Sequence, residues 1–213
     1  DKLGLRRRLA LEIWRKLEGD NSKSHPLRQL FWECTLRCNL NCRHCGSDCK
    51  SVAQQKDMPL EDFLGVLDNI AAHTNPHKVF VIVTGGEPLM QPEFLIETLR
   101  LCKDSGINTC IDTSGVGLGR YEEILKYTDL ILYDVKHFTS DGYRNVTGSD
   151  MAETLKFLSV AERMNVPIIA RHVVVEGVTD GEEHIKALAK YLKGFKTLKK
   201  AELLGYHTLG VQK

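Results

Sequence analysis

Short apolar runs and amphipathic helical patterns alternate along the chain from residue 28 onward, and this order limits the fold more than any other feature. The apolar runs are rich in β-branched and aromatic residues and predict strands at 30–34, 78–84, 107–112, 130–135, 167–175 and 200–204. Apolar residues at helical spacing predict intervening helices at 59–73, 92–104, 121–127, 149–164 and 181–192. Such alternation is typical of parallel strands joined by right-handed helical crossovers.

The number of strand–helix units separates two architectures. The chain supplies six strands, the last without a following helix, whereas a closed barrel of this type needs eight units. We therefore predict an α/β fold, a partial (β/α)6 TIM-type barrel of parallel strands with outer helices, and keep a doubly wound sheet as the alternative. Either architecture places the ligand site at the C-terminal ends of the strands.

A basic amphipathic pattern precedes the alternating region. Leucine or isoleucine occupies every fourth position from Leu5 to Leu17, with arginine and lysine between, which predicts an N-terminal amphipathic helix. A helix of this kind can lie on a membrane surface, but packing on its own domain is the commoner case. We expect an N-terminal helix and linker over residues 1–24 and one domain over residues 25–213.

Composition excludes several classes of protein. Among 213 residues, 42% are hydrophobic, which is enough to build a full core. Lys and Arg total 29 against 28 Asp and Glu, so no global positive field attracts nucleic acid. No apolar run approaches the length of a membrane span. The odd count of 7 cysteines and the absence of a recognisable signal peptide favour a reducing cytoplasm over a disulfide framework.

Three cysteines, Cys38, Cys42 and Cys45, follow the first expected strand with the spacing Cys-x3-Cys-x2-Cys. Three thiolates on one short loop can hold three irons of a four-iron cluster and leave the fourth iron open to a small molecule. Zinc is the alternative, because Cys34, His44 or Cys49 would supply the fourth ligand that a structural zinc site requires. A disulfide framework is the least favoured interpretation.

Only one register of the cysteine spacing is consistent with the sequence. A triplet that began at Cys34 would need a third ligand at position 41, which is asparagine. We therefore expect Cys34 and Cys49 to lie outside the ligand set. Cys102 and Cys110 fall within an expected helix and strand, where a buried structural thiol is the commonest role of cysteine.

Glycines and polar residues recur at the C-terminal ends of the expected strands, with Arg171 within the fifth strand and His207 past the sixth. A parallel sheet would gather them near the cysteine loop, which carries Cys38, Cys42 and Cys45. The residues gathered in this way are Gly85, Gly86 and Glu87, then Asp112 and Thr113, then Asp134 and Lys136, then Arg171, and finally His207. Glycine allows close backbone approach, and carboxylates accept from an ammonium group or bind a hard cation. Taken one at a time, an ordinary turn, surface carboxylates and a solvated histidine remain alternatives.

The cysteine triplet, the segment Gly85-Gly86-Glu87-Pro88 and the six-unit order together resemble the radical S-adenosylmethionine (SAM) superfamily. The resemblance implies a [4Fe-4S] cluster on Cys38, Cys42 and Cys45 that binds SAM through its open iron. It further implies that one electron from the cluster cleaves SAM to methionine and a 5′-deoxyadenosyl radical, which removes a hydrogen atom from a substrate. The cofactor carries this chemistry, and the protein supplies positioning and exclusion of water.

From residue 102 onward the chain is similar to pyruvate formate-lyase activating enzymes, through segments 109–115, 129–136, 171–175 and 202–207. That similarity implies a protein or peptide substrate, with a glycyl-radical enzyme favoured, and an electron donor such as flavodoxin or ferredoxin. The SAM contacts implied by it, together with the two turn glycines, are Gly85, Gly86, Glu87, Asp112, Lys136 and His207. It also implies a monovalent cation held by Asp112, Thr113, Asp134 and the carbonyl of Leu132, with Arg171 near the substrate.

The front part of the chain carries a second resemblance. Segments 25–38 and 57–63 resemble radical SAM peptide-maturation enzymes rather than activating enzymes. The sequence therefore predicts a radical SAM oxidoreductase that activates a glycyl-radical enzyme, with a peptide maturase as the alternative. A zinc or simple iron–sulfur binding domain without turnover is the third hypothesis.

Overall fold

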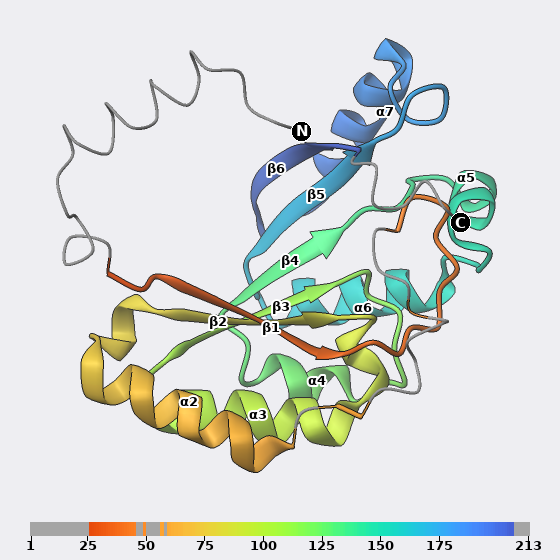
Figure 1. Cartoon of the computed structure of the whole chain (residues 1–213). Helices are drawn as coiled ribbons and strands as arrows, with labels where there is room; N and C mark the ends of the chain where they lie inside the picture. Colours follow the sequence, from red (N-terminus) through yellow and green to blue (C-terminus); the bar gives the residue numbers. More distant parts are fainter. Residues whose placement is uncertain (1–25, 46–48, 50–55, 58, 207–213) are drawn as a thin grey trace, which may run out of the picture.

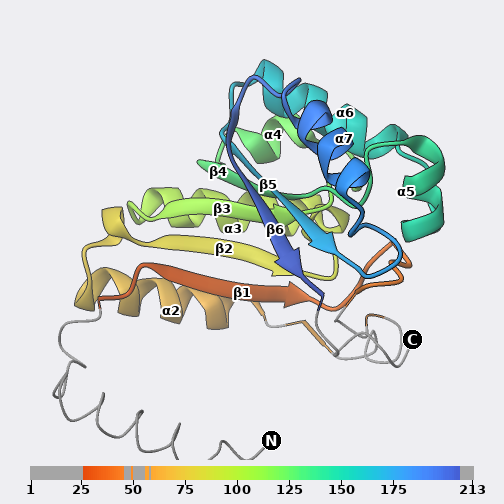
Figure 2. The same ribbon diagram turned by 90° about the horizontal axis from the view of Figure 1, so that it is seen from above.

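Six parallel strands form one sheet, and they lie side by side in the order in which they occur along the chain. The computed structural model describes residues 26–45, 49, 56–57 and 59–206. The strands are β1 (Gln29–Thr35), β2 (Phe80–Gly85), β3 (Asn108–Thr113), β4 (Leu130–Asp134), β5 (Ile168–Val174) and β6 (Leu198–Gly205). Figure 1 shows their arrows pointing the same way, and Figure 2 shows the sheet curving from β1 to β6.

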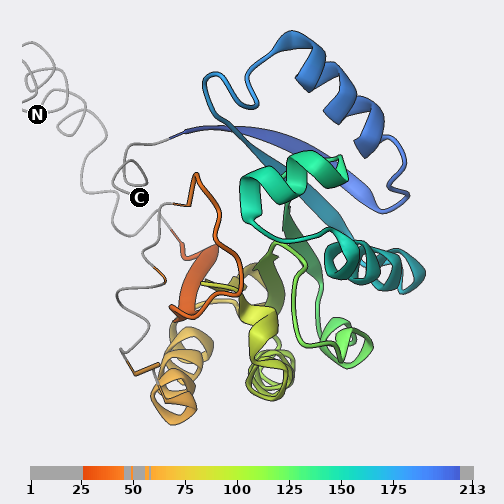
Figure 3. The ribbon, with the colours of Figure 1, turned by 90° about the vertical axis from the view of Figure 1, so that its right-hand side faces the viewer.

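The helices cover the convex face of this curved sheet. They are α2 (Leu60–His73), α3 (Pro92–Asp104), α4 (Tyr121–Leu125), α6 (Ala152–Arg163) and α7 (Glu182–Leu192). Figure 3 looks onto the C-terminal ends of the strands and shows these helices outside the arc. A doubly wound sheet reverses its strand order, whereas this order never reverses. The partial barrel is therefore confirmed and the doubly wound alternative is wrong.

Strand alternation divides the sheet into an outer apolar face and an inner face that becomes polar at one end. Val79, Val81 and Val83 are fully buried and belong to the core shared with the helices. Cys34 also lies in this outer core, where burial raises the pKa of its thiol to about 12. Side chains at the alternate positions of the strands point to the inner face, and those of Thr84 on β2 and Asp112 on β3 line a cavity inside the barrel. Cys34 therefore lies on the opposite face of β1 from a site inside the barrel.

One helix was not expected from the sequence. Helix α5 (Ser140–Thr147) begins after Thr139, whose hydroxyl accepts a hydrogen bond from the Gly142 amide at 3.2 Å, and ends at Gly148 with a φ of 76°. Figures 1 and 2 show it beyond the arrowheads of the strands. The following helix begins later than predicted, at Ala152, where the Asp150 carboxylate accepts from the Ala152 amide at 2.8 Å.

Some sequence predictions fall outside the described residues. The N-terminal amphipathic helix, its linker and His207 are among them, so the boundary between the two expected domains stays a prediction. Among the helices that are described, none is long and apolar enough to cross a membrane.

Two glycines bring the end of β2 against the end of β1. The Gly86 amide donates to the Thr35 carbonyl at 2.7 Å, and the Glu87 amide donates to the Arg37 carbonyl at 3.0 Å. A Cβ on Gly85 would lie 2.2 Å from the Thr35 oxygen, and one on Gly86 would lie 2.1 Å from the Arg37 oxygen. These glycines are thus required by a contact between two stretches of protein backbone, at the point where β1 leads into the cysteine loop.

This contact predicts opposite effects of alanine at two glycines. Gly86→Ala forces the two backbones apart and should lower the free energy of unfolding by about 3 kcal/mol or more. Gly65 lies inside α2 with nothing within 4 Å of its Cβ position, so Gly65→Ala should raise the free energy of unfolding by about 0.5–1 kcal/mol. Urea unfolding of both variants checks this, and a harmless Gly86→Ala would contradict the packing described.

Candidate active site

A cavity of about 450 Å³ opens at the C-terminal ends of the strands. Its walls come from the cysteine loop, from the turns after β2 and β3, from the C-terminal end of β4 and from β5. The lining residues are Cys38, Leu40, Cys42, His44, Cys45, Thr84, Gly85, Gly86, Glu87, Asp112, Thr113, Ser114, Asp134, Lys136, Arg171 and Val173. The cavity gathers every predicted site residue that the structure describes except Leu132. Leu132 lies on β4, beside Asp112 in the β3–β4 register.

Backbone contacts fix the cysteine loop on the side away from β2. The Asn41 amide donates to the Thr147 carbonyl and the Arg43 amide to the Val146 carbonyl, both at 3.0 Å. The Asn39 side chain donates to the Val116 carbonyl at 3.2 Å. The loop is therefore held between the strand ends and the last turn of α5.

The three cysteines face the cavity in a partly buried environment. Burial raises the pKa of the Cys42 thiol to about 11, and Lys136 opposes this shift. Burial also raises the pKa of Cys38. Thiolates at this site therefore need a positive partner, as they would have in a metal cluster. Within the described part of the chain, no three cysteine, histidine or acidic side chains gather closely enough to hold a single metal ion.

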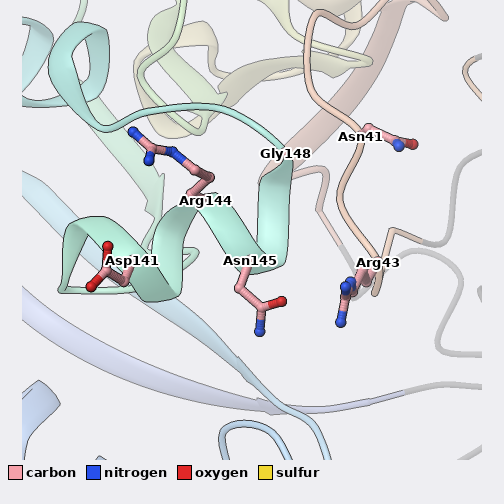
Figure 4. A pocket seen from close by; sticks show the side chains of 6 residues that line it. All are labelled: Asn41, Arg43, Asp141, Arg144, Asn145 and Gly148. Atoms are coloured by element: carbon pink, nitrogen blue, oxygen red, sulfur yellow. The ribbon is translucent and has the colours of Figure 1, made fainter.

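A second, more open pocket of about 460 Å³ lies between the cysteine loop and α5. Figure 4 shows its side chains, with Asn41 and Arg43 on the loop and Asp141, Arg144 and Asn145 on the helix. The lining is polar, and it includes none of the predicted site residues. We therefore assign the ligand site to the inner cavity rather than to this surface pocket.

Glu87 is buried, and its carboxylate is already engaged. One oxygen accepts from the Leu89 amide at 3.2 Å and from the Thr113 hydroxyl at 2.6 Å. The other accepts from the Ser114 amide at 2.9 Å and the Ser114 hydroxyl at 2.6 Å. Burial raises the pKa of Glu87, and the hydrogen bonds from Ser114 and Thr113 oppose that shift. Glu87 thus joins the turn after β2 to the end of β3, and its contact with SAM stays a prediction.

Arg171 lies between the two carboxylates that were expected to hold a cation. Its guanidinium pairs with Asp112, and its Nη2 lies 2.7 Å from Oδ1 of Asp134. Lys136 donates to Oδ2 of Asp134 at 2.9 Å. Burial raises the pKa of Asp112 to about 6, and the charge of Asp134 adds to the shift. Burial acts the same way on Asp134, but Lys136 and Arg171 outweigh it and lower that pKa.

These ion pairs change the interpretation of the predicted cation site. The guanidinium already pairs with both carboxylates, so a monovalent cation between them would have to displace Arg171. The Thr113 hydroxyl donates to Glu87 and accepts from the Gly115 amide at 2.8 Å, which leaves it little capacity for a cation. The described arrangement therefore fits a bound cation poorly while Arg171 stays in place.

Sequence reasoning missed two partners of the predicted residues. Ser114 supplies two of the hydrogen bonds to Glu87, and Thr84 donates to Asp112 at 3.2 Å. Both line the cavity. Their positions carried a signal, because Thr84 precedes the two turn glycines on β2 and Ser114 follows Asp112 and Thr113. What the sequence did not show is which side chains these hydroxyls would face.

Comparison with known proteins agrees with this geometry. The model of the radical SAM superfamily matches residues 32–192. A pyruvate formate-lyase-activating enzyme from Clostridium pasteurianum is 44% identical over 177 residues, which cover 83% of this chain and 74% of that protein. An alignment of that length extends well in front of residue 102, so the likeness to activating enzymes is not confined to the C-terminal half.

Solved structures show the same fold. Streptococcus suis SuiB bound to its precursor peptide SuiA has a TM-score of 0.70 at 17% identity, and SuiB bound to SAM has 0.68 at 19%. Both matches cover 97% of this chain, which spans only 46% of SuiB. A domain of the pyruvate formate-lyase-activating enzyme from Bacteroides vulgatus has a TM-score of 0.54 at 29% identity, over 60% of this chain and 81% of that domain. The chain therefore belongs to the radical SAM superfamily and, within it, to the family of pyruvate formate-lyase-activating enzymes.

Proposed function

We propose that this protein activates a glycyl-radical enzyme by removing a hydrogen atom from a backbone glycine of that partner. The observation that carries the proposal is the 44% identity to an activating enzyme over most of the chain. The cavity adds support, because it brings the cysteine triplet together with the polar strand ends. When bound, a [4Fe-4S] cluster and SAM supply the electron and the 5′-deoxyadenosyl group that this chemistry requires.

In this proposal Cys38, Cys42 and Cys45 hold the cluster. All three line the inner cavity and lie on one loop that is tied down on both sides. Lys136 supports the assignment, because burial alone would lower the pKa of its ammonium group, whereas pairing with Asp134 outweighs burial and raises that pKa above the usual value. A buried ammonium group at this position favours thiolate over thiol in the ligand set.

SAM would occupy the remainder of the cavity. Gly85 and Gly86 expose backbone there, and Lys136 and Asp112 present opposite charges to a ligand that itself carries both an amine and a carboxylate. Glu87 lines the same region, where four hydrogen bonds hold its carboxylate in place, and we keep it among the proposed SAM contacts. His207 completes the proposed SAM contacts.

The substrate and the electron donor are the least constrained parts of the proposal. Arg171 would face a peptide segment entering the cavity, and flavodoxin or ferredoxin would supply the electron. We also propose a cytoplasmic location. The peptide-maturase alternative rests on two short segments near the front of the chain, and the likeness to SuiB supports the fold alone.

The proposal predicts a stored glycine radical on a partner protein. Anaerobically reconstituted protein is mixed with SAM, a reductant and pyruvate formate-lyase, and electron paramagnetic resonance is recorded. We expect a glycyl radical that requires all three additions. SAM cleavage without a radical on this or another glycyl-radical enzyme would reject the activase, and a mass change in a co-expressed peptide would then favour the maturase.

The cysteine register gives a second prediction. Cys38→Ala, Cys42→Ala and Cys45→Ala should each lose bound iron and reduce 5′-deoxyadenosine formation to the level without protein, because each removes one ligand. Cys34→Ala and Cys49→Ala are the matched controls and should keep both. Iron analysis and chromatography of the nucleoside products measure the two quantities. Equal loss in Cys34→Ala would show that the register is wrong.

Arg171 allows the expected cation site to be tested by stability. Arg171→Gln leaves Asp112 and Asp134 without the guanidinium and should lower the free energy of unfolding by roughly 2–3 kcal/mol. If the two carboxylates form a cation site, potassium chloride should restore more of this loss than choline chloride at equal ionic strength. Thermal unfolding of Arg171→Gln in both salts measures the recovery of stability. Equal recovery in the two salts would mean that the carboxylates form no selective cation site.

A further inference from the structure

Tyr143 on α5 is almost fully buried, and its hydroxyl has no hydrogen-bond partner. The residue is 1% exposed, and its oxygen belongs to the few buried side-chain polar atoms without a partner in the described part of the chain. Leaving such a group unpaired costs about 1–3 kcal/mol. Buried tyrosines usually pair their hydroxyl, so this one calls for an explanation.

The surroundings of Tyr143 are the cysteine loop itself. The ring belongs to a small apolar cluster with Leu40, Cys42, Val116 and Met151, and Cys38 and Cys45 pack against that cluster. This cluster is separate from the main core between the sheet and the helices. Because α5 also accepts the backbone hydrogen bonds of Asn41 and Arg43, the position of the ring relative to Cys42 is fixed by the backbone.

The phenol hydroxyl of Tyr143 carries its proton at neutral pH and can act as a hydrogen-bond donor. A thiolate or sulfide sulfur is an acceptor, and it is the kind of atom that a cluster would add beside Cys42.

We propose that the Tyr143 hydroxyl donates a hydrogen bond to a sulfur of the cluster held by Cys38, Cys42 and Cys45, and thereby raises the reduction potential of that cluster. The inference rests on the proposed function, because it requires the cluster. The physical reason is that the reduced cluster carries one more negative charge, so the hydrogen bond stabilises it more than the oxidised form. Tyr143 is a positioning and tuning residue, since it acts through the cluster.

Tyr143→Phe removes one oxygen and keeps the ring. We expect unchanged iron content and a cluster that is roughly tenfold harder to reduce, which corresponds to a shift of about 59 mV to lower potential for one electron. Without iron, the variant should be no less stable than the parent, because the lost hydroxyl had no partner. A redox titration followed by electron paramagnetic resonance, together with thermal unfolding of the iron-free proteins, measures these effects.

The chain supplies a matched control in Tyr191. Its hydroxyl is also buried without a partner, but the residue lies on α7 against Phe138 and Phe195. Tyr191→Phe should leave the potential unchanged. In a second readout, after exchange into deuterium oxide, the parent cluster should show one exchangeable deuteron coupling more than Tyr143→Phe, because the Leu40 amide donates to Sγ of Cys38 in both proteins.

The outcomes separate the two proposals. Iron-loaded Tyr143→Phe with the potential and deuteron coupling of the parent would overturn the hydrogen bond and leave the proposed function intact. An equal shift in Tyr191→Phe would also overturn it, because the effect would then be a general one. A parent that binds no iron after anaerobic reconstitution would overturn both the hydrogen bond and the function.

Discussion

The contact between the ends of β1 and β2 is the constraint on which the rest of the site depends. Two backbone hydrogen bonds, of 2.7 and 3.0 Å, and two glycines without room for a side chain bring the turn after β2 against residues 35–37. The cysteine loop starts at that point, so its first ligand is placed by sheet geometry. Its middle is placed by α5, which binds the backbone on both sides of Cys42. A loop fixed at two places can present three ligands in one arrangement.

Charge organises the other side of the cavity. Asp112, Asp134, Lys136 and Arg171 lie near the C-terminal ends of neighbouring strands and pair with one another. Taking such charges out of water is costly, and replacement by apolar residues often leaves stability unchanged or improved. The set is therefore better explained by ligand binding than by stability of the fold. Arg171 can pair either with the two carboxylates or with a bound ligand. In this structure it pairs with the carboxylates.

Much of the fold followed from alternation in the sequence. The order of apolar runs and helical patterns predicted six parallel strands with outer helices. The placement of Asp112 and Arg171 on the inner face came from the structure. Helix α5 was missed because it is short and contains Gly142, although Thr139 and Gly148 marked its ends. The part played by Tyr143 depends on that helix, so it was missed as well.

The hydrogen-bond and ion-pair partners of the site residues could not be predicted from the sequence. Gly85, Gly86 and Glu87 were correctly expected at the cavity, but the glycines meet protein backbone and Glu87 meets Thr113 and Ser114. Arg171 was expected near a substrate, and it lies between Asp112 and Asp134. Residue types indicated the chemistry, whereas the partners depend on strand register and on the docking of two turns.

The central claim is that the loop held between the strand ends and α5 carries a four-iron cluster with one iron open to SAM. Electron paramagnetic resonance of the reduced, anaerobically reconstituted protein, recorded before and after SAM is added, tests this most directly. The account predicts four irons per chain, the number in one such cluster, and a spectrum that changes when SAM is added. Bound zinc without iron, or an iron–sulfur spectrum that SAM leaves unchanged, would contradict it.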